Sequence, residues 1–422
     1  MAVGSIIRSA VCSPVRGALA GGSSLIGTAT GQLGGLVPLH YWDFTTNRAL
    51  FAGADVGDID NTPGWSFARA STGYAETAAG VLNLFASGEL RRTDKGVLIE
   101  GAKTNICLRS QEFDNATWSK SNGGVGSVPV VTADAGAAPD GTMTADRVQF
   151  ALNGGATASD LSFLNQSITI TTATTYSTTV YAKSNTASTY TLEIVDESNV
   201  AATLITVTPT WQRFEVQNTS STTSGRCRIQ ARGGTTSDAA DVLLWGFQLE
   251  TALGASSYIP TTTASVTRAA DVLTVSSPGV DYPLSLFVEF TRASSTTGGE
   301  TYLRLDDGTD NERALLGKVA STNLARMIVV DGGVTQADVT IAGALAVNTV
   351  YRIAGAAATN RVQICRNGTP GTEDTVATMP ATPTALRFGV NTGTATQPFS
   401  YFRRAAIFNT ALTDAQLQAA TA

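Results

Sequence analysis

Residues 175–198 read TYSTTVYAKSNTASTYTLEIVDES, two runs of alternating side chains joined by a short polar link. In the second run Tyr190, Leu192 and Ile194 share one parity, with smaller or polar side chains mostly between them. Successive side chains of a strand point to opposite faces, so the alternation predicts a half-buried strand. Thr and Val carry much of the signal, because β-branched side chains suit a pleated surface.

The same alternation recurs on both sides of this stretch, with turn residues between the runs. The neighbouring runs are TADRVQFAL (144–152), LNQSITIT (164–171), ATLITVTP (202–209), WQRFEVQNT (211–219), GRCRIQARG (225–233) and DVLLWGFQLE (241–250). Their spacing predicts a jelly-roll type of β-sandwich over residues 111–271. A second series of such runs predicts a second sandwich over residues 272–422, ending in a short helix capped by Thr413. The predicted fold class is therefore all-β.

The N-terminal part differs from the two predicted sandwiches. Residues 1–40 are rich in Gly and poor in charge, which predicts an extended arm that orders only by packing on a partner. A floppy terminus is the open alternative. Cys12 and Arg16 are the candidate contact residues of this arm. The aromatic and turn-rich residues 41–110 predict a small β-rich collar.

Charge and hydropathy narrow the classes of partner. Charged residues make up 15% of the chain, and 28 Lys and Arg against 34 Asp and Glu give a net charge of −6. Because phosphate binding needs clustered cations, nucleic acid is not expected as a partner. Residues 17–42 lack acidic side chains but contain too much Gly, Ser and Thr for membrane insertion. The N-terminus does not resemble a signal peptide, so synthesis and folding in the cytoplasm are expected.

Few residues are suited to catalysis. His40 is the single histidine, and the chain has no nucleophile elbow, zinc-protease or phosphate-loop motif. Many carboxylates stand in Asp-Gly turns, where aspartate supports the turn geometry. The four cysteines lie far apart without metal spacing, which predicts unpaired thiols, and Cys12 is the candidate for intermolecular pairing. The protein is expected not to be an enzyme.

A resemblance to a known group of proteins rests on three segments. GVLIEGAKTNICLRSQEFDNATWSKSN (96–122) is similar to a segment of tailed-phage tail-fibre and particle-surface proteins. Residues 243–272 resemble the end of a carbohydrate-binding-module jelly roll, and the residues from 281 onward resemble a concanavalin A-like or laminin-G-like domain. The matched positions of the first segment are Glu100, Gly101, Thr104, Asn105, Ser110, Phe113, Asn115 and Trp118.

The resemblance implies a virion protein that contacts host surface glycans. A tail fibre or receptor-binding protein, trimeric and docked on other virion proteins through the arm, is the leading hypothesis. A head fibre or capsid-decorating protein is the alternative, and a polysaccharide depolymerase is a third. Sugar sites of this kind pair an aromatic face with polar side chains, so Trp118, Tyr181 and Tyr401 are the glycan-binding candidates. Trp118, in a loop-like polar segment, and Tyr401 are expected to be exposed. No cofactor is expected except a structural calcium ion, for which Asp241 is the candidate.

Overall fold

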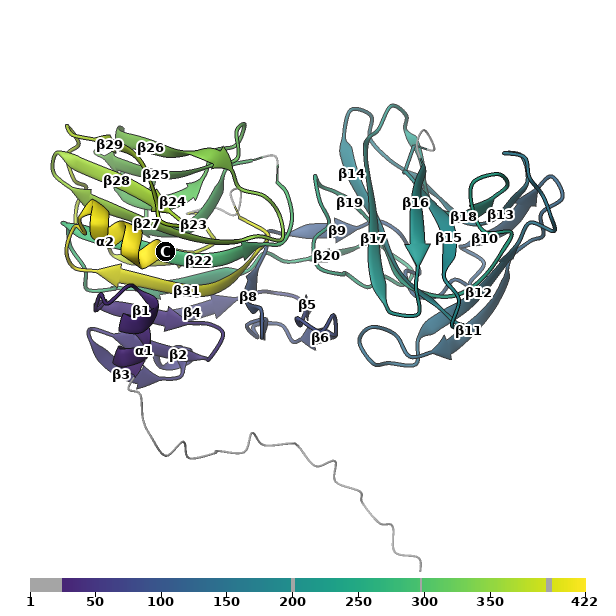
Figure 1. Ribbon diagram of the computed structural model, residues 1–422, viewed down its shortest axis with the longest axis horizontal. Coiled ribbons are helices and arrows are strands. Elements are labelled where there is room, and N and C mark those ends of the chain that lie inside the picture. The colour runs from purple at the N-terminus through teal and green to yellow at the C-terminus, as the bar shows by residue number, and fades with distance from the viewer. Residues whose placement is uncertain (1–24, 199–201, 297, 392–396) are drawn as a thin grey trace, which may run out of the picture.

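The fold is known from a computed structural model that describes residues 25–198, 202–296, 298–391 and 397–422 (Figure 1). Antiparallel strands in several sheets make up almost all of its regular structure, and the sheets pack in pairs. The predicted all-β class with two β-sandwiches is confirmed. Two short helices, α1 (Leu25–Gln32) and α2 (Asp414–Thr421), are the helical elements of the described residues together with one 3-10 turn, η1 (Ile59–Asn61).

The jelly-roll sandwich consists of two five-stranded sheets. One has the order β10 (Ser119–Gly123), β13 (Leu161–Thr169), β18 (Ser224–Arg232), β15 (Tyr190–Val195) and β16 (Ala202–Val207). The other has the order β11 (Val130–Gly136), β12 (Ala145–Ala151), β19 (Ala239–Thr251), β14 (Thr175–Ser184) and β17 (Gln212–Thr219). Leu192 and Ile194 are fully buried in the core between these sheets, as the alternation in β15 predicts.

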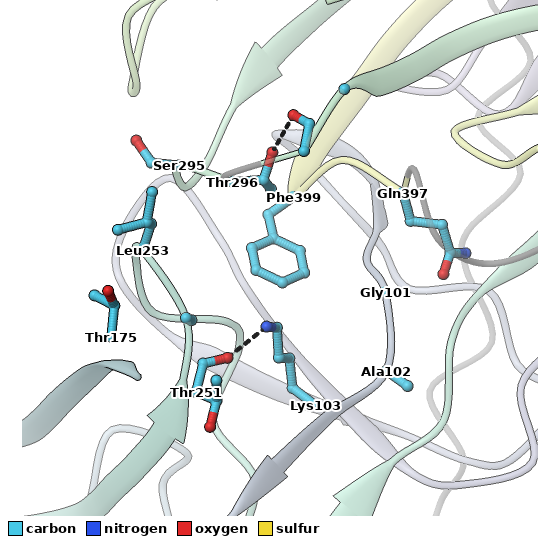
Figure 2. A pocket seen from close by; sticks show the side chains of 13 residues that line it. Gly101, Ala102, Lys103, Thr175, Thr251, Leu253, Ser295, Thr296, Gln397 and Phe399 are labelled. Carbon is cyan, nitrogen blue, oxygen red and sulfur yellow. Dashed lines mark hydrogen bonds between the residues drawn. The ribbon is translucent and has the colours of Figure 1, made fainter. Parts of the chain in front are cut away.

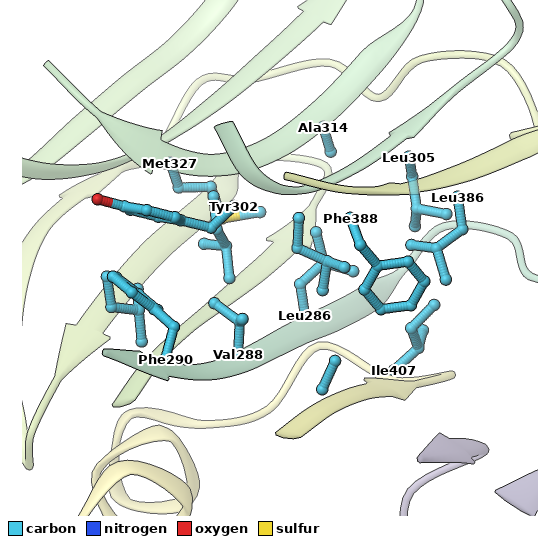
Figure 3. Close-up of a cluster of buried hydrophobic side chains, with 14 of the residues drawn as sticks. Leu286, Val288, Phe290, Tyr302, Leu305, Ala314, Met327, Leu386, Phe388 and Ile407 are labelled. Carbon is cyan, nitrogen blue, oxygen red and sulfur yellow. The ribbon is translucent and has the colours of Figure 1, made fainter. Parts of the chain in front are cut away.

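The second sandwich pairs a ten-stranded sheet with a seven-stranded sheet. The larger sheet runs β29 (Thr369–Asp374), β28 (Arg361–Arg366), β27 (Val350–Ala358), β22 (Leu284–Arg292), β31 (Ser400–Phe408), β1 (His40–Asp43), β2 (Arg48–Phe51) and β3 (Ala54–Gly57), with β8 (Gly96–Ile99) beside β31 and β7 (Arg92–Thr93) beside β8. The smaller sheet runs β26 (Val334–Ala344), β25 (Leu324–Asp331), β24 (Arg313–Lys318), β23 (Glu300–Asp306), β30 (Ala385–Phe388), β21 (Val272–Ser276) and β4 (Trp65–Ala68). Figure 3 shows Leu286, Val288 and Phe290 of β22 facing Tyr302, Met327 and Phe388 in the core between them.

The predicted collar of residues 41–110 is not a separate unit. Strands β1 to β3, β7 and β8 extend the ten-stranded sheet, and β4 extends the seven-stranded sheet. The physical reason lies in β1, whose four residues are all buried and which pairs along its length with β31. A strand that is buried on both faces cannot form one layer of a small exposed collar, so it inserts into a larger sheet.

The predicted arm of residues 1–40 is too long at its C-terminal end. Residues 25–32 form α1, and Leu25, Ala29 and Leu33 pack against the second sandwich, in one cluster with Leu417 of α2. Helix α2 begins as predicted at Thr413, whose side chain accepts a hydrogen bond from the amide of Gln416. The arm candidates Cys12 and Arg16 lie outside the described residues.

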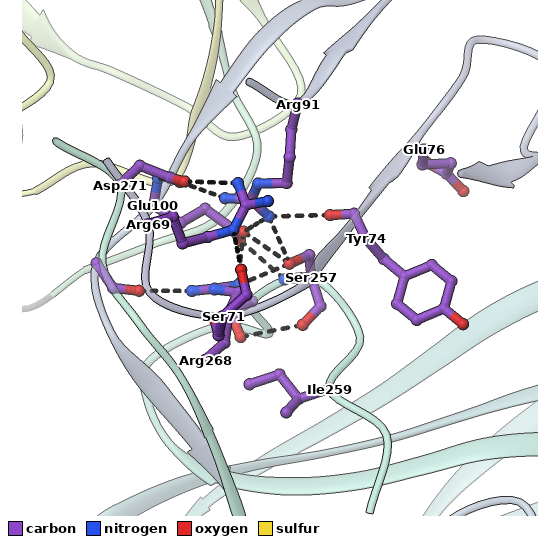
Figure 4. A network of polar contacts seen from close by, with 12 residues as sticks. Arg69, Ser71, Tyr74, Glu76, Arg91, Glu100, Ser257, Ile259, Arg268 and Asp271 are labelled. Carbon is purple, nitrogen blue, oxygen red and sulfur yellow. Dashed lines mark hydrogen bonds and ion pairs between the residues drawn. The ribbon is translucent and has the colours of Figure 1, made fainter. Parts of the chain in front are cut away.

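A buried ionic network lies where the two sandwiches join. Arg69, Arg91 and Arg268 converge on Glu100 and Asp271, and the five side chains are almost completely buried (Figure 4). The Arg91 guanidinium spans both carboxylates, bonding Glu100 at 2.5 Å and also Asp271. The network ties strands of residues 65–99 to the segment that links the jelly roll with the second sandwich.

Two small sheets complete the junction. The hairpin of β5 (Gly73–Glu76) and β6 (Leu82–Phe85) packs on the jelly roll through Tyr74 and Leu82. Strands β9 (Lys103–Asn105) and β20 (Val266–Arg268) pair with each other, so the chain enters and leaves the jelly roll through adjacent strands.

Candidate functional site

A cleft of about 510 Å³ opens at the junction of the two sandwiches and the β5–β6 hairpin. The jelly roll contributes Tyr181 of β14, Arg213 of β17 and the loop that follows β19. The second sandwich contributes residues of β8, β22 and β31 from the facing side. The lining consists of Glu76, Leu82, Lys95, Leu98, Glu100, Tyr181, Arg213, Ala255, Ser256, Ser257, Tyr258, Thr291, Ala293, Asn348, Tyr401 and Arg403.

Three tyrosines form the inner wall of this cleft. Tyr181 and Tyr258 pack around Trp245, with ring centroids 5.6 Å and 4.5 Å from the tryptophan ring. Gly246 lets the two rings approach, because a Cβ at this position would lie 3.1 Å from the Tyr181 ring and its φ is +64°. Burial raises the pKa of Tyr181 to about 12. The wall is therefore neutral across the physiological pH range.

Tyr401 closes the wall from the side of the second sandwich. Its hydroxyl accepts a hydrogen bond from the backbone amide of Glu76 at 3.1 Å and donates to the carbonyl of the same residue at 3.2 Å. Its ring lies beneath the Lys95 ammonium, 5.4 Å from the centroid. Tyr181 is covered in a similar way by the Arg213 guanidinium, also at 5.4 Å. The tyrosines thus position cations at the cleft instead of presenting open ring faces.

The charged groups of the cleft differ in how far they are neutralised. Lys95 bonds Glu76 at 2.5 Å, and Arg403 bonds the buried Glu289 at 2.8 Å, while about a third of each of the Lys95, Glu76 and Arg403 side chains stays exposed. Arg213 donates to neutral oxygens, among them the carbonyl of Ser256 at 2.6 Å. Of the described carboxylates, none lies within ion-pair distance of Arg213. The cleft can therefore donate hydrogen bonds to an incoming ligand at several points and accept them at Glu76.

Glu100 lies at the base of the cleft and is held as a carboxylate. Burial alone would raise its pKa, but Arg268, Arg91 and hydrogen bonds from Ser257 outweigh burial and lower the pKa to about 2. The Ser257 amide and hydroxyl donate to it at 2.8 Å and 2.7 Å. A carboxyl group with such a low pKa cannot donate a proton at neutral pH.

A second hollow of about 440 Å³ lies at the same junction (Figure 2). Lys103 reaches into it, donating to the carbonyl of Thr251 at 2.6 Å with its ammonium 5.6 Å from the centre of the Phe399 ring. Burial lowers the pKa of Lys103. Its lining includes Thr296, Gly298 and Gln397, which are next in sequence to residues that the structure does not describe, so the first cleft is the candidate site.

The structure brings two of the three predicted aromatic residues, Tyr181 and Tyr401, to the cleft and places Trp118 in the core of the jelly roll. Trp118 is 1% exposed and packs between Phe113 and Phe247, so the prediction that it is an exposed platform is wrong. Its indole donates to the carbonyl of Arg109 at 2.9 Å, which turns the ring into the core although the segment is a loop. Tyr401 is 7% exposed, and its predicted exposure is also wrong, but Tyr401 and Tyr181 line the same cleft.

The calcium candidate does not fit a metal site. Asp241 accepts hydrogen bonds from Arg147 at 2.9 Å and 2.5 Å and from Asn185 at 3.2 Å, so a guanidinium already occupies both carboxylate oxygens. Among the described residues, no group of three or more His, Cys, Asp or Glu side chains is placed to bind a metal ion.

Three of the four cysteines are described, and they are buried free thiols. They are Cys107, Cys227 and Cys365. In the described part of the chain, no helix is both long and apolar enough to cross a membrane.

Sequence reasoning missed the polar residues of the cleft. These residues are Glu76, Lys95, Arg213 and Arg403, and none of them stands in a motif. Glu76 and Lys95 are near each other in the sequence, but Arg213 and Arg403 are each more than a hundred residues from any other member of the set. The pairing of β8 with β31 brings the Lys95 segment beside Arg403, and the packing of the β5–β6 hairpin on the jelly roll adds Glu76 and Arg213. No local pattern in the sequence carries that information.

Comparisons with known proteins give matches among solved structures alone. No protein-family model matches the chain, and no curated protein matches it in sequence. Among solved structures, the chain is similar to the Ruminococcus gnavus IT-sialidase CBM40 bound to α2,3-sialyllactose, with 14% identity over 33% of this chain and 82% of that one and a TM-score of 0.29. It is also similar to domain 4 of AbnA, a GH43 extracellular arabinanase from Geobacillus stearothermophilus in complex with arabinotriose, with 12% identity, 40% and 82% coverage and a TM-score of 0.30. A third similar structure is a heptameric SAP-like pentraxin from Limulus polyphemus, with 9% identity, 32% and 68% coverage and a TM-score of 0.26.

Proposed function

We propose that this chain is a structural surface protein of a tailed-phage particle, a tail fibre or receptor-binding protein that attaches to host surface glycans. The observation that carries the glycan part is the cleft between the two sandwiches, where partly exposed Lys95, Glu76 and Arg403 stand at the edge of a tyrosine wall. The particle part rests on the resemblance of residues 96–122 and of the two modules to phage surface proteins.

The cleft suits a sugar because it offers donors and acceptors beside apolar surface. A pyranose presents hydroxyl groups around its edge and C–H groups on its faces, so it needs both kinds of contact at once. Lys95 and Arg403 supply donors, and Glu76 supplies acceptors. The half-buried Ala255 and Ala293 add apolar surface. Because cations already cover the rings of Tyr181 and Tyr401, we expect weak attachment on the order of millimolar affinity, about −4 kcal/mol.

Attachment then depends on several copies acting together. We place the chain in a homo-oligomer, a trimer, docked on other virion proteins through the residues that precede α1. Linking binding sites can raise the avidity by ~10²–10⁴-fold without any new contact. Residues 1–24, including Cys12 and Arg16, lie outside the described part of the chain and are the proposed docking segment.

The proposal contains no hydrolytic step. Glycoside hydrolysis needs two carboxyl groups, one of which acts as a proton donor. Of the two in the cleft, Glu100 is held by Arg91 and Arg268, and Glu76 is paired with Lys95. Both are therefore better suited to holding structure or accepting hydroxyl hydrogens than to acid catalysis.

A capsid-decorating or head-fibre protein with the same modules is the second candidate. The burial of Trp118, Tyr181 and Tyr401 favours it, because none of the three presents an open ring face to a sugar. In that role both sandwiches would serve mainly as spacers on the particle.

The test compares two arginine variants for binding to host cells and to polysaccharide purified from their surface. Arg403→Ala removes a donor from the cleft, whereas Arg361→Ala removes a similarly exposed, ion-paired arginine elsewhere on the second sandwich. Loss of binding in Arg403→Ala alone would support the cleft as the glycan site. Equal binding by both variants, or no binding by the unaltered protein even when presented as a multimer, would contradict it.

Locating the chain on intact particles decides between the two candidates. A map of the particle with this chain placed at the tail would support the receptor-binding role. Placement on the capsid surface, with adsorption unchanged in particles that lack the chain, would favour decoration.

A further inference from the structure

The outer face of one jelly-roll sheet carries a row of arginines along β18. Arg226, Arg228 and Arg232 share one parity of this strand, and Cys227, Ile229 and Ala231 of the other parity lie in the core. The arginines therefore project from the face that is turned away from the core. β10 and β13 of the same sheet lie at the end of the molecule remote from the second sandwich (Figure 1).

These arginines lack acidic partners. The buried arginines at the junction each bond a carboxylate, but no ion pair joins Arg226, Arg228 or Arg232 to any described residue. The Nε atoms of all three are buried and have no hydrogen-bond acceptor there. Arg228 is 8% exposed, and its guanidinium lies 3.7 Å above the Phe163 ring of β13.

The positive charges of these arginines repel one another, and a row without acidic partners is unusual in a chain with an excess of acidic residues (net charge −6). Burial, and next the charge of Arg226, lower the pKa of Arg228 to about 10 despite the opposing effect of Glu193. Three cations on one strand, without counter-charges in contact, are costly to keep together. A bound anion would remove that cost.

Hydrogen-bond acceptors stand among the arginines on the same face. Gln230 is 5% exposed, and its side-chain NH2 group donates to Glu193 of β15 at 2.6 Å. The carbonyl Oε1 of Gln230 receives no hydrogen bond. Glu193 also accepts from Thr235 at 3.0 Å. Asn165 is the cross-strand neighbour of Arg228, and its Oδ1 is likewise buried without a donor. Both oxygens are covered by protein atoms, so a ligand on this face meets the outer NH groups of the arginines.

We propose that the outer face of the β10-β13-β18-β15-β16 sheet binds an acidic glycan, a polysaccharide whose sugars carry carboxylate or sulfate groups. Arg226, Arg228 and Arg232 bind the anionic groups. Alternate residues of a strand are spaced by roughly 7 Å, so the row presents charge over about 20 Å, enough for several sugars. This site is separate from the cleft and goes beyond the proposed function, which does not specify an acidic ligand.

The face fits an acidic glycan better than a single-stranded nucleic acid. Binding of single strands relies on aromatic side chains on which successive bases stack. Phe163 is the aromatic side chain of this face, and the Arg228 guanidinium already covers it.

The experiment measures binding of the full chain to four probes at low and physiological salt. The probes are polygalacturonate, dextran sulfate, neutral dextran and an oligothymidylate. The double variant Arg226→Gln/Arg232→Gln leaves the buried Arg228 in place, so the sheet should still fold. Arg326→Gln/Arg361→Gln, two half-exposed arginines of the second sandwich, is the matched control.

We expect the unaltered chain to bind one of the acidic polysaccharides and not neutral dextran. The double variant should bind at least about tenfold more weakly, because two charge-assisted contacts are lost, and the control should bind normally. The preferred probe distinguishes carboxylate from sulfate. Equal binding by the double variant and the control would overturn the proposal, and so would stronger binding to oligothymidylate than to both polysaccharides. Weaker binding by Arg403→Ala together with normal binding by the double variant would assign the polysaccharide to the cleft and overturn the proposal.

Discussion

Glu100→Gln should destabilise the protein far more than a change at a surface ion pair. Glu100 is 2% exposed and accepts four hydrogen bonds, from Arg91, Arg268 and the amide and hydroxyl of Ser257. Glutamine keeps the side-chain volume but removes the negative charge. Arg91 and Arg268 would then be buried beside Asp271 as their nearest remaining carboxylate.

The magnitude follows from the pKa of Glu100. A pKa of about 2 against an ordinary 4.5 means that the network stabilises the carboxylate over the protonated acid. At about 1.4 kcal/mol for each pKa unit, this difference is roughly 3 kcal/mol. Breaking a buried ion pair by removal of one partner typically costs a similar 3–5 kcal/mol. We therefore expect the free energy of unfolding to fall by about 3 kcal/mol.

The pH dependence has a definite sign. A carboxyl group whose pKa is lower in the folded state stabilises the fold above its unfolded pKa, and that stabilisation is lost as the pH falls through the folded pKa. The unaltered protein should lose this contribution between about pH 4.5 and pH 2, since the folded pKa is about 2. Glu100→Gln should already lack it at neutral pH, so the two stability curves should converge at low pH.

Guanidinium unfolding followed by tryptophan fluorescence and by far-UV circular dichroism measures the effect. Asp55→Asn is the control, because its partner Arg48 is 44% exposed and a pair of this kind contributes only about 0–1 kcal/mol. If Glu100→Gln lost no more stability than Asp55→Asn, the network would not hold the sandwiches together as argued.

Four other perturbations test separate parts of the structure. Trp118→Ala should lower the unfolding free energy by about 3–5 kcal/mol in denaturant titrations, since the ring is buried in the core; a loss below about 1 kcal/mol would contradict that burial. Gly96→Ala should cost at least about 2 kcal/mol in the same assay, because φ is +114° and the new Cβ would meet the carbonyl of Phe402, and a neutral change would show that this approach is looser. The single histidine, His40, should titrate in NMR spectra near pH 4, because burial lowers its pKa. The stability of the fold should therefore decrease as the pH falls from about 6.5 to 4, where the unfolded chain binds a proton and the folded chain does not. A midpoint near pH 6.5 would show that the imidazole is exposed to water. A chain that begins at Leu25 should keep its melting temperature but not join particles, and normal incorporation would remove residues 1–24 as the docking segment.

Local pattern was sufficient for the strands but not for their partners. Alternation located β15 and placed Leu192 and Ile194 in the core, because the two-residue period of a strand is visible in any short window. The pairing of β1 with β31 joins residues some 360 positions apart, and nothing local distinguishes it from a pairing inside a small collar. The error for residues 41–110 follows from this.

Side-chain direction in loops is the other point at which sequence reasoning failed. Trp118 stands among polar residues, which favoured exposure, yet a single hydrogen bond to Arg109 and contacts with Phe113 and Phe247 turn it inward. The arginine row of β18 is the opposite case. Arg226, Arg228 and Arg232 have the same parity in GRCRIQARG, and the opposite parity is apolar or small, so strand periodicity alone indicates that the three side chains share the outer face.

The two proposed binding surfaces should respond differently to loosening of the junction. The cleft exists only where the sandwiches and the β5–β6 hairpin meet, and Glu100 belongs both to its lining and to the network that fixes this meeting. The arginine row lies within one sheet, and the strand pairing of β18 with β13 and β15 sets its geometry. Under conditions where it stays folded, Glu100→Gln should therefore weaken binding at the cleft while the acidic-glycan face keeps its affinity. Parallel loss at both surfaces would instead mean that the jelly roll itself depends on the junction, and that the two sandwiches are one cooperative unit.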